Sequence, residues 1–218
     1  MDFYFGIIVQ EIYYYKENHM NEEMLRELAG KSVKEKYIEA YNTAITRQGS
    51  KELLDWMLKT DFFTAPASSK FHSAYEGGLC EHSLNVYNAM IDRYNEGKPD
   101  ESYAIAALLH DLCKAEFYKL GSRNVKNETT GQWEKVPFYS IEDKFPFGHG
   151  EKSVFLIERF MRLKVDEAIA IRWHMGGFDD AARGGSFAIN GAFEKYPLLV
   201  KLHIADIEAT YLMENQPQ

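Results

Sequence analysis

The chain has 218 residues, of which 45% are hydrophobic, and it carries a formal net charge of −8 at pH 7. This length supports one hydrophobic core of ordinary size and leaves little room for two large domains. The acidic balance excludes a protein that holds nucleic acid through a basic surface alone. No apolar run approaches the roughly 20 residues that span a bilayer, and the first residues lack the basic segment of a signal peptide. We expect a cytoplasmic protein with no membrane partner and no extended nucleic-acid surface.

The first part of the chain shows helical periodicity. Apolar residues recur three and four positions apart between residues 21 and 62, which predicts two or three amphipathic helices. Residues 1–20 fit either a strand or a helix. The stretch 64–79 is rich in Pro, Ser and Gly and predicts a loop. We expect residues 1–66 to form a helical N-terminal extension packed on the core, and residues 67–218 to form the main domain.

The main domain is predicted to be helical with one interruption. A long helix is expected at 80–96, and an almost wholly apolar helix is expected over 101–118. Between about 118 and 142, β-formers flank a polar Asn-Glu-Thr-Thr-Gly centre, which predicts a β-hairpin. Helical periodicity then returns, a glycine-rich loop is expected at 176–193, and a last helix closes the chain. The predicted fold class is an all-α bundle with one inserted β-hairpin.

The cysteines do not indicate a disulfide framework. Cys80 and Cys113 are the only two, and their spacing matches neither a CxxC pair nor a zinc knuckle. We expect each to pack as a small apolar residue beside a metal-ligand segment.

Six side chains of metal-binding types are distributed over the predicted helices. Histidine and carboxylate are the commonest nitrogen and oxygen ligands of Mn, Fe, Zn, Co and Ni, and a site in a helical bundle takes one or two ligands from each helix. The adjacent His-Asp pair ends an apolar helix, where two ionisable groups are costly unless they are paired or ligated. The six candidates are His82, His110, Asp111, His149, His174 and Asp206.

Taken singly, the other candidates have structural alternatives. His82 could be an ordinary partly buried histidine, His149 could cap a helix, and His174 could meet a helix dipole as a cation. His203 lies three residues before Asp206 on the same helical face, so it is either a partner of a ligand or a core histidine. The joint order of the six residues favours a metal site.

The sequence around these residues resembles the HD-domain superfamily of metal-dependent phosphohydrolases, over residues 70–212. The HDxxK continuation is similar to the HD domain of a class of bacterial 3′ to 5′ exoribonucleases, although no OB-fold module is recognisable here. The glycine-tyrosine-proline extension of the superfamily's cyclic-dinucleotide phosphodiesterases is missing. The resemblance is carried by GGLCEHSLNV around His82, ALLHDLCK around His110 and Asp111, GHGEKS around His149, IRWHMG around His174 and LHIADIEA around Asp206.

The resemblance implies an HD-type fold and a metal-dependent hydrolase of a small phosphorylated molecule, most naturally a nucleotide. It also implies two divalent metal ions, drawn from Fe, Mn, Co, Ni, Zn and Mg. Two other classes stay open: a diiron oxygenase with the same ligand order, and a non-catalytic nucleotide-binding module. In the implied arrangement Asp111 bridges the metals, one of which takes His82, His110 and Asp206 and the other His149 and His174.

Four further residues are candidates for substrate contacts. Lys114 follows Asp111 by three positions and could bring an ammonium to a phosphate oxygen, with a surface lysine as the alternative. His72 could contact substrate or protonate a leaving alkoxide, or be a structural loop residue. Arg123 belongs to the hairpin, which could edge the pocket and select the substrate. Arg172 is a candidate for phosphate binding, with a surface ion pair as the alternative. The predicted catalytic residues are thus Asp111, Lys114 and His72, and the predicted substrate-binding residues are Lys114, His72, Arg123 and Arg172.

Overall fold

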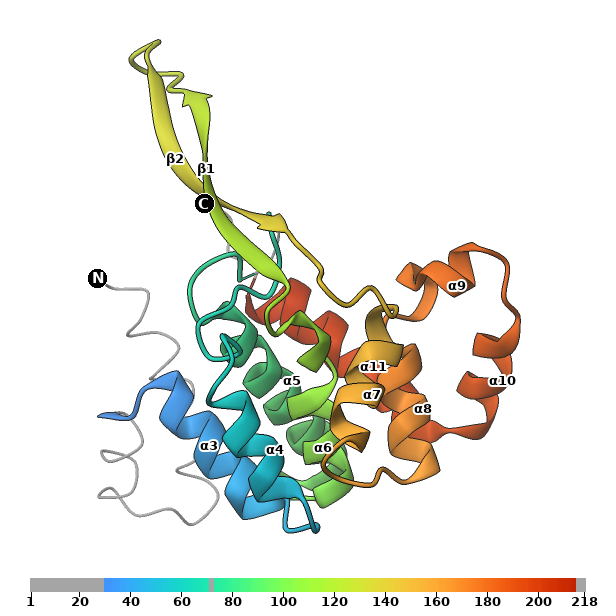
Figure 1. Ribbon diagram of the computed structural model, residues 1–218. Coiled ribbons are helices and arrows are strands. Elements are labelled where there is room, and N and C mark those ends of the chain that lie inside the picture. The colour runs from blue at the N-terminus through green and yellow to red at the C-terminus, as the bar shows by residue number, and fades with distance from the viewer. Residues whose placement is uncertain (1–29, 71–72, 215–218) are drawn as a thin grey trace.

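The computed structural model describes residues 30–70 and 73–214. Helices dominate this part of the chain, and its only strands form one antiparallel pair (Figure 1). The predicted combination of a helical body with one inserted hairpin is confirmed at this level. None of the helices in the described ranges is both long and apolar enough to cross a membrane. The elements are α3 (Val33–Ala44), α4 (Ser50–Met57), α5 (Gly78–Asn95), α6 (Glu101–Leu109), β1 (Tyr118–Lys126), β2 (Trp133–Ile141), α7 (His149–Glu158), α8 (Val165–Trp173), α9 (Asp180–Arg183), α10 (Ala188–Lys195) and α11 (Pro197–Glu208).

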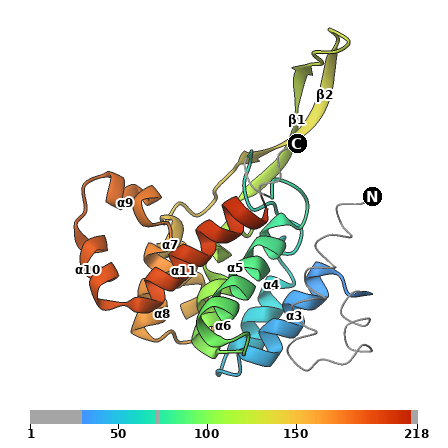
Figure 2. The same cartoon turned by 180° about the vertical axis from the view of Figure 1, so that it is seen from behind.

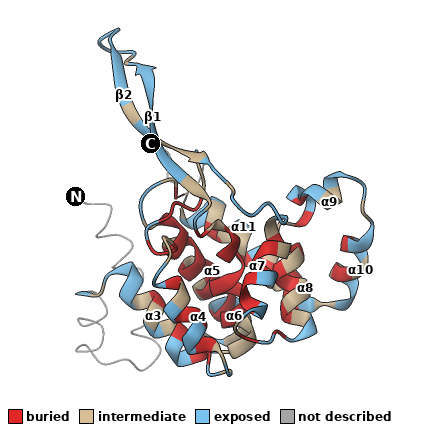
Figure 3. Ribbon diagram, viewed as in Figure 1, coloured by how far each residue is buried: buried red, intermediate tan, exposed pale blue. Residues whose placement is uncertain are grey.

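Helix α6 is the central helix of the body. Its sequence, ESYAIAALL, is apolar on nearly every side, and residues 104–109 are fully buried. Asp100 fixes its start by accepting a hydrogen bond from the Tyr103 amide at 2.9 Å. Helices α3, α5, α8 and α11 pack around it, and buried residues concentrate along α5 and α6 (Figure 3). The end of α6 therefore delivers the following residues into the interior.

Helices α3 and α4 share this core, beside α5 and α6 (Figure 2). The side chains of Tyr37 and Tyr41 in α3 are at most 1% exposed. The Tyr37 hydroxyl donates a hydrogen bond of 2.6 Å to the Leu108 carbonyl in α6. Of the predicted N-terminal extension, residues 1–66, the helical part seen here thus contributes to the same core as the rest of the chain. Residues 1–29 lie outside the described residues.

Arg47, in the loop between α3 and α4, ties that loop to the bundle. Its guanidinium donates to both carboxylate oxygens of Glu167 in the first turn of α8 and to Glu101 at the start of α6. The Glu167 side chain is 0% exposed, so Arg47 compensates a charge that burial alone would make costly. This network fixes the beginnings of α6 and α8 relative to α3 and α4.

The predicted β-hairpin at about 118–142 is confirmed. β1 and β2 pair antiparallel in a register that closes with Lys126 opposite Trp133. At the tip, the Asn127 side-chain oxygen accepts hydrogen bonds from the backbone amides of Thr129 and Thr130, which stabilises the turn. Beyond its first residue β1 is exposed throughout. The hairpin projects away from the helices in both opposite views (Figure 1, Figure 2).

The helix expected over 101–118 is shorter than predicted. It ends at Leu109, because the backbone of Asp111 leaves the helical conformation, with φ −101° and ψ 19°. The amide of Cys113 then donates to the Ser153 hydroxyl at 3.0 Å instead of continuing the helix. One 3-10 turn follows before the chain enters β1.

The glycine-rich stretch 176–193, expected as a loop, contains α9 and most of α10. Asp179 starts α9, since its side-chain oxygen accepts hydrogen bonds from the amides of Ala181 and Ala182. The sequence pattern Asp-Asp-Ala-Ala therefore acts as a helix start within the stretch.

Candidate metal centre

His110 and His174 share one local geometry at a helix end. They directly follow the last residues of α6 and α8, and both side chains are fully buried. Each Nδ1 atom donates a 2.7 Å hydrogen bond to the carbonyl three residues earlier, on Ala107 and Ile171 respectively. This bond fixes the tautomer, because Nδ1 keeps its hydrogen and Nε2 is left as an acceptor.

The remaining candidates approach from other helices. His82 lies in the second turn of α5, His149 is the first residue of α7, and Asp206 lies in α11. The Nε2 atom of His82 is 3.3 Å from Nε2 of His110 and 3.3 Å from Oδ1 of Asp206. The rings of His110 and His174 meet edge to face, with centroids 4.8 Å apart. Four imidazoles from four helices thus converge on one point.

Asp111 lies between these histidines and faces them with both carboxylate oxygens. Its Oδ1 atom is 2.9 Å from Nε2 of His149 and 3.6 Å from Nε2 of His174. Its Oδ2 atom is 3.5 Å from Nε2 of His110 and 3.8 Å from Nε2 of His82. The carboxylate therefore joins one pair of histidines to the other.

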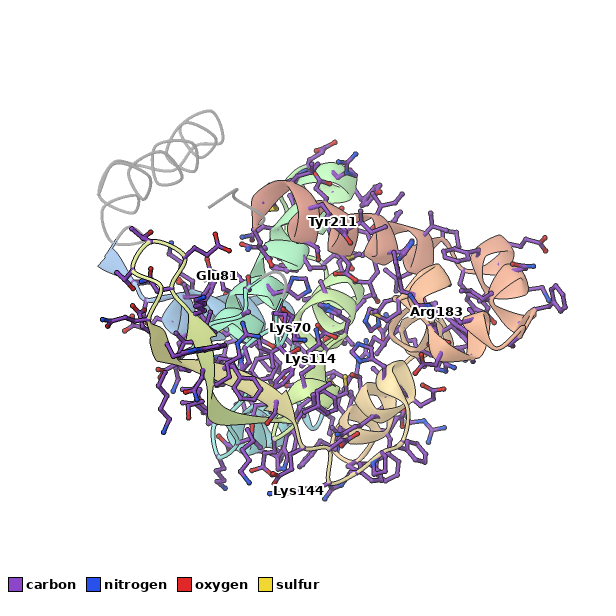
Figure 4. The ribbon with its side chains drawn as sticks, turned by 90° about the horizontal axis from the view of Figure 1, so that it is seen from above. Lys70, Glu81, Lys114, Lys144, Arg183 and Tyr211 are labelled. Atoms are coloured by element: carbon purple, nitrogen blue, oxygen red, sulfur yellow. The ribbon has the colours of Figure 1, made fainter. Side chains whose placement is uncertain are left out.

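The open side of this cluster is marked by Lys114 and His149. The Nζ atom of Lys114 lies 2.6 Å from Oδ2 of Asp111, across the 3-10 turn. His149 has the most exposed side chain of the six candidates, at 30%. Seen from above, Lys114 lies near the middle of the body, whereas Lys144 and Arg183 lie toward its rim (Figure 4). The side of His149 is therefore where the cluster is least covered by protein.

Neighbouring anionic groups raise the pKa of two histidines. Burial alone lowers the pKa of His82, but hydrogen bonds to Asp206 and Glu214 outweigh it and raise the value to about 10. Burial also lowers the pKa of His149, and the Cys113 sulfur and the Asp111 carboxylate together raise it to about 10. The charges around both imidazoles thus favour their protonated forms in the absence of a metal ion, and a metal bound at either ring would replace a proton.

The pKa values of the two candidate carboxylate ligands, Asp111 and Asp206, are lowered. Burial raises the pKa of Asp111, but the charges of Lys114 and His110 hold it well below its usual range. The pKa of Asp206 is also lowered, because the hydrogen bond from His82 outweighs burial. Both groups therefore stay ionised at neutral pH.

His174 supplies the test of whether a metal fits. Burial lowers the pKa of His174 to about 4, and the nearby Asp111 opposes this only in part. Its Nε2 atom is the only buried side-chain nitrogen or oxygen in the described ranges that lacks a hydrogen-bond partner. Such an atom is unfavourable unless something binds its lone pair. A cation at this point would satisfy it.

The donor atoms have the spacing and chemistry that divalent metals require. Imidazole nitrogens combined with carboxylate oxygens suit Mn, Fe, Co, Ni and Zn. The buried cluster can therefore hold a metal ion. Three groups have donor atoms within 4.8 Å of one another: His82 with His110 and Asp111, His110 with His174 and Asp206, and Asp111 with His149 and His174.

Two residues beside the cluster were not among the predicted site residues. Glu214 lies 3.1 Å from Nδ1 of His82, and the Cys113 sulfur lies 3.4 Å from Nδ1 of His149. The sequence predicts Cys113 beside a metal-ligand segment, since it follows Asp111 by two positions, but it does not predict the contact with His149. The position of Glu214 carries no comparable signal in the sequence.

His203 supports the cluster through the backbone. Its Nδ1 atom donates a hydrogen bond of 2.6 Å to the carbonyl of His174, and its ring contacts Phe193. Gly176 leaves room for this ring: a Cβ atom there would lie 2.4 Å from the imidazole, and the φ of +56° also favours glycine. His203 is therefore a partner of a candidate ligand rather than a ligand itself.

Of the predicted substrate-binding residues, Arg172 is not brought to the cluster. His72 lies outside the described residues. The guanidinium of Arg172 forms ion pairs with Glu151 and Asp179 and stacks 3.9 Å above the Trp173 ring. These contacts occupy Arg172 in the packing of α7, α8 and α9, which is the ion-pair alternative.

Arg123 lines a cleft between the hairpin and residues 69–70 and 74–76. The cleft has a volume of about 550 Å³, and none of the six candidate metal ligands lines it. Tyr118 lies between this cleft and the metal-ligand cluster. Its ring centroid is 6.4 Å from that of Tyr139, which lines the cleft. Burial raises the pKa of Tyr118 to about 12, and the charge of Lys114, beside the cluster, opposes this shift. The lining includes two cations, one carboxylate and three aromatic rings: Lys70, Arg123, Glu76, Tyr75, Phe138 and Tyr139.

No protein-family model, curated protein or solved structure gives a significant match to the chain. Its function is therefore argued from the site and its chemistry.

Proposed function

We propose that the protein is a metal-dependent phosphohydrolase of the HD-domain type, acting on a nucleotide or another small phosphorylated molecule. The observation that carries the proposal is the Asp111 carboxylate, whose two oxygens each face a different pair of histidines. A carboxylate in this position is suited to join two metal ions. The unpartnered Nε2 atom of His174 and the motifs around the ligands support the same conclusion.

The proposed ligand division is the one that the resemblance implies, and several contacts support it. His82, His110 and Asp206 would hold one metal ion, and His149 and His174 would hold the other, with Asp111 shared between them. The contact of His82 with Asp206 supports the first group, and the contacts of Asp111 Oδ1 support the second. A further group of close donor atoms, from His110, His174 and Asp206, takes residues from both proposed sets.

Divalent metal ions supply Lewis-acid polarisation of a phosphoryl group and activation of water for its attack. Asp111 would be shared between the two sets of ligands and would hold them together. Lys114 adds a positive charge at the open side, within reach of a phosphoryl oxygen. Burial opposes this charge, but Asp111 more than compensates and raises the pKa of Lys114, so the ammonium persists at neutral pH. His72 stays a candidate for protonating the leaving group.

The cleft beside the hairpin suits the part of the substrate that is not cleaved. Lys70 and Arg123 attract anionic groups, while the rings of Tyr75, Phe138 and Tyr139 offer faces on which a base can stack. Arg123 already lies 6.0 Å from the centre of the Phe138 ring. A nucleotide combines an aromatic ring with phosphate charge, and we therefore place its nucleoside portion in this cleft.

The test is a hydrolysis screen of the metal-free protein reloaded with Mn, Fe, Co, Ni, Zn or Mg. The substrates are bis-p-nitrophenyl phosphate and a panel of nucleotides with monoester, diester and anhydride bonds. Turnover should require metal, and Asp111→Asn should lower kcat/KM by about 100-fold or more, because the amide cannot join two cations. Asp180→Asn, at an exposed position, is the matched control. Equal turnover by wild type and Asp111→Asn would sink the proposed mechanism.

Two other outcomes of the screen would favour the two alternative functions, a nucleotide-binding module and a diiron oxygenase. Tight nucleotide binding by the metal-loaded protein without product formation would indicate a binding module. Oxygen consumption by iron-loaded protein with an iron redox signal, and without release of phosphate, would indicate an oxygenase.

A further inference from the structure

We infer that Glu214 is a positioning residue that fixes His82 as a metal ligand, an inference that rests on the proposed metal centre. Glu214 follows the π-helical turn Ala209–Met213 at the end of α11. Its side chain is only 3% exposed, and its two oxygens lie 3.1 and 3.2 Å from Nδ1 of His82. A buried carboxylate thus meets the ring nitrogen that faces away from the cluster.

The His82 imidazole is held between two carboxylates on opposite nitrogens. Asp206 contacts Nε2 at 3.3 Å, on the side of the cluster, and Glu214 engages Nδ1 from behind. A carboxylate at Nδ1 keeps the hydrogen on that atom, leaves Nε2 to bind metal, and makes it a stronger donor. Glu214 therefore selects the ligating atom of His82 and orients its ring.

A side chain is needed for this task because of where His82 lies. His110 and His174 use backbone carbonyls, which are free because they belong to the last turns of their helices. His82 lies inside α5, where the nearby carbonyls are already bonded within the helix. An acceptor for Nδ1 must come from elsewhere in the fold, and the C-terminal segment provides it.

Glu214 is itself held in place. The Ser73 hydroxyl donates to it at 2.9 Å, and the Asn85 amide, one turn beyond His82 on α5, donates at 3.0 Å. Together with Nδ1 of His82, three donors converge on the two carboxylate oxygens. This restricts the rotamer of Glu214 and makes it a rigid support.

The π turn directs Glu214 to the same imidazole as Asp206. In a regular α-helix, a residue eight positions beyond Asp206 would lie about 80° further around the axis. The wider turn, closed by the Glu214 amide on the Ala209 carbonyl at 3.0 Å, rotates less per residue. It brings Glu214 back toward the face of Asp206, so that one continuous segment delivers both carboxylates to His82.

The experiment is a titration of the metal-free full-length protein with Co²⁺ alone, followed by visible absorption and equilibrium dialysis. The proteins are wild type, Glu214→Gln, Glu214→Ala and, as matched control, Glu208→Gln. Glu208 is a partly exposed carboxylate on α11 that pairs with Arg93. In Glu214→Gln the affinity for one of the two Co²⁺ ions should fall about 10- to 100-fold with a changed spectrum, while the other ion and Glu208→Gln behave as in wild type.

The folding of each variant is checked by circular dichroism, and Glu214→Gln decides the matter if Glu214→Ala does not fold. If Glu214→Gln binds Co²⁺ with wild-type affinity and spectrum, the role of Glu214 is overturned while the proposed metal centre stands. Equal weakening of both ions, together with a lower thermal midpoint of the metal-free protein, would overturn it in favour of a general structural role. Absence of Co²⁺ binding by wild type would overturn the proposed centre, and the role of Glu214 with it.

Discussion

The Nε2 atom of His149 lies 2.9 Å from Oδ1 of Asp111, although 38 positions separate the two residues in the sequence. The hairpin explains this proximity. Its antiparallel strands return the chain to the point that it left, where the Glu142 amide donates to the Phe117 carbonyl at 2.9 Å. An insertion of this shape lengthens the connection between the two ligands without moving them apart.

Replacing His149 by alanine should lower the number of bound metal ions from two to one. His149 and His174 are the histidines on the Oδ1 side of Asp111, so one metal ion would lose a ligand while the other kept its set. Equilibrium dialysis with elemental analysis measures the stoichiometry at saturating metal. His82→Ala is the counterpart and should release the other ion. A ratio that stays near one in wild type and in His149→Ala would reject the binuclear assignment.

Replacing Arg123 by alanine should raise KM for nucleotides by about tenfold, the effect expected when one charge-assisted hydrogen bond is lost. Hydrolysis of bis-p-nitrophenyl phosphate should change little, since this compound has no nucleoside to occupy the cleft. Lys126→Ala, an exposed cation on the same strand, is the control. Identical effects of the two substitutions would indicate general electrostatic attraction instead of a binding contact.

Replacing Arg47 by methionine should destabilise the fold by about 3–5 kcal/mol, because the fully buried Glu167 would lose both guanidinium contacts and keep only the exposed Lys164 ammonium, at 3.7 Å, as a compensating charge. Urea denaturation of the metal-free protein measures the loss. Lys98→Met removes the exposed pair with Glu96 and should leave the stability nearly unchanged. Similar losses for both variants would contradict the role given to the Arg47 network.

The pair of Arg47 and Glu167 also determines how the stability of the protein depends on pH. Burial raises the pKa of Glu167, but Arg47 outweighs it, so the pKa lies below its ordinary value of 4.5. A carboxylate of this kind contributes stability that is complete above the unfolded pKa and is lost as the pH falls through the folded one. The stability difference between wild type and Arg47→Met should therefore be largest at neutral pH and shrink below about pH 4.5. A difference that grows on acidification would contradict the assignment.

Replacing Tyr37 by phenylalanine should cost about 1–2 kcal/mol, because the Leu108 carbonyl would lose the hydroxyl that bonds to it inside the core. Tyr211→Phe removes a hydroxyl from a side chain that is 57% exposed and should be close to neutral. Thermal and urea denaturation measure both. Equal stability of the two variants would show that the contact between α3 and α6 contributes little.

Much of the fold follows from patterns that report burial directly. The apolar character of residues 104–109 predicts a buried helix, and the β-formers around Asn127 predict the hairpin. The end of α6 could not be placed in the same way. Leu112 and Cys113 are as buried as the helix before them, so the apolar pattern continues while the backbone changes at Asp111.

The gathering of the candidate ligands was predictable as a set, whereas their supports were not. An adjacent His110 and Asp111 at the end of an apolar helix indicates a buried polar site from composition alone. Glu214 lies near the end of the chain among polar residues, and only the π turn gives it a direction toward His82. Arg172 shows the converse, since its place in the sequence beside a ligand does not reveal that Glu151 and Asp179 take up its charge.

The delivery of both Asp206 and Glu214 by one C-terminal segment has a consequence for biosynthesis. Helices α5 and α6 leave the ribosome well before α11, because synthesis proceeds from the N-terminus. During that interval His82 has neither of the carboxylates that hold it. The complete set of ligands and supports exists only after residue 214 has left the ribosome, so the proposed metal centre can form no earlier than that point in synthesis.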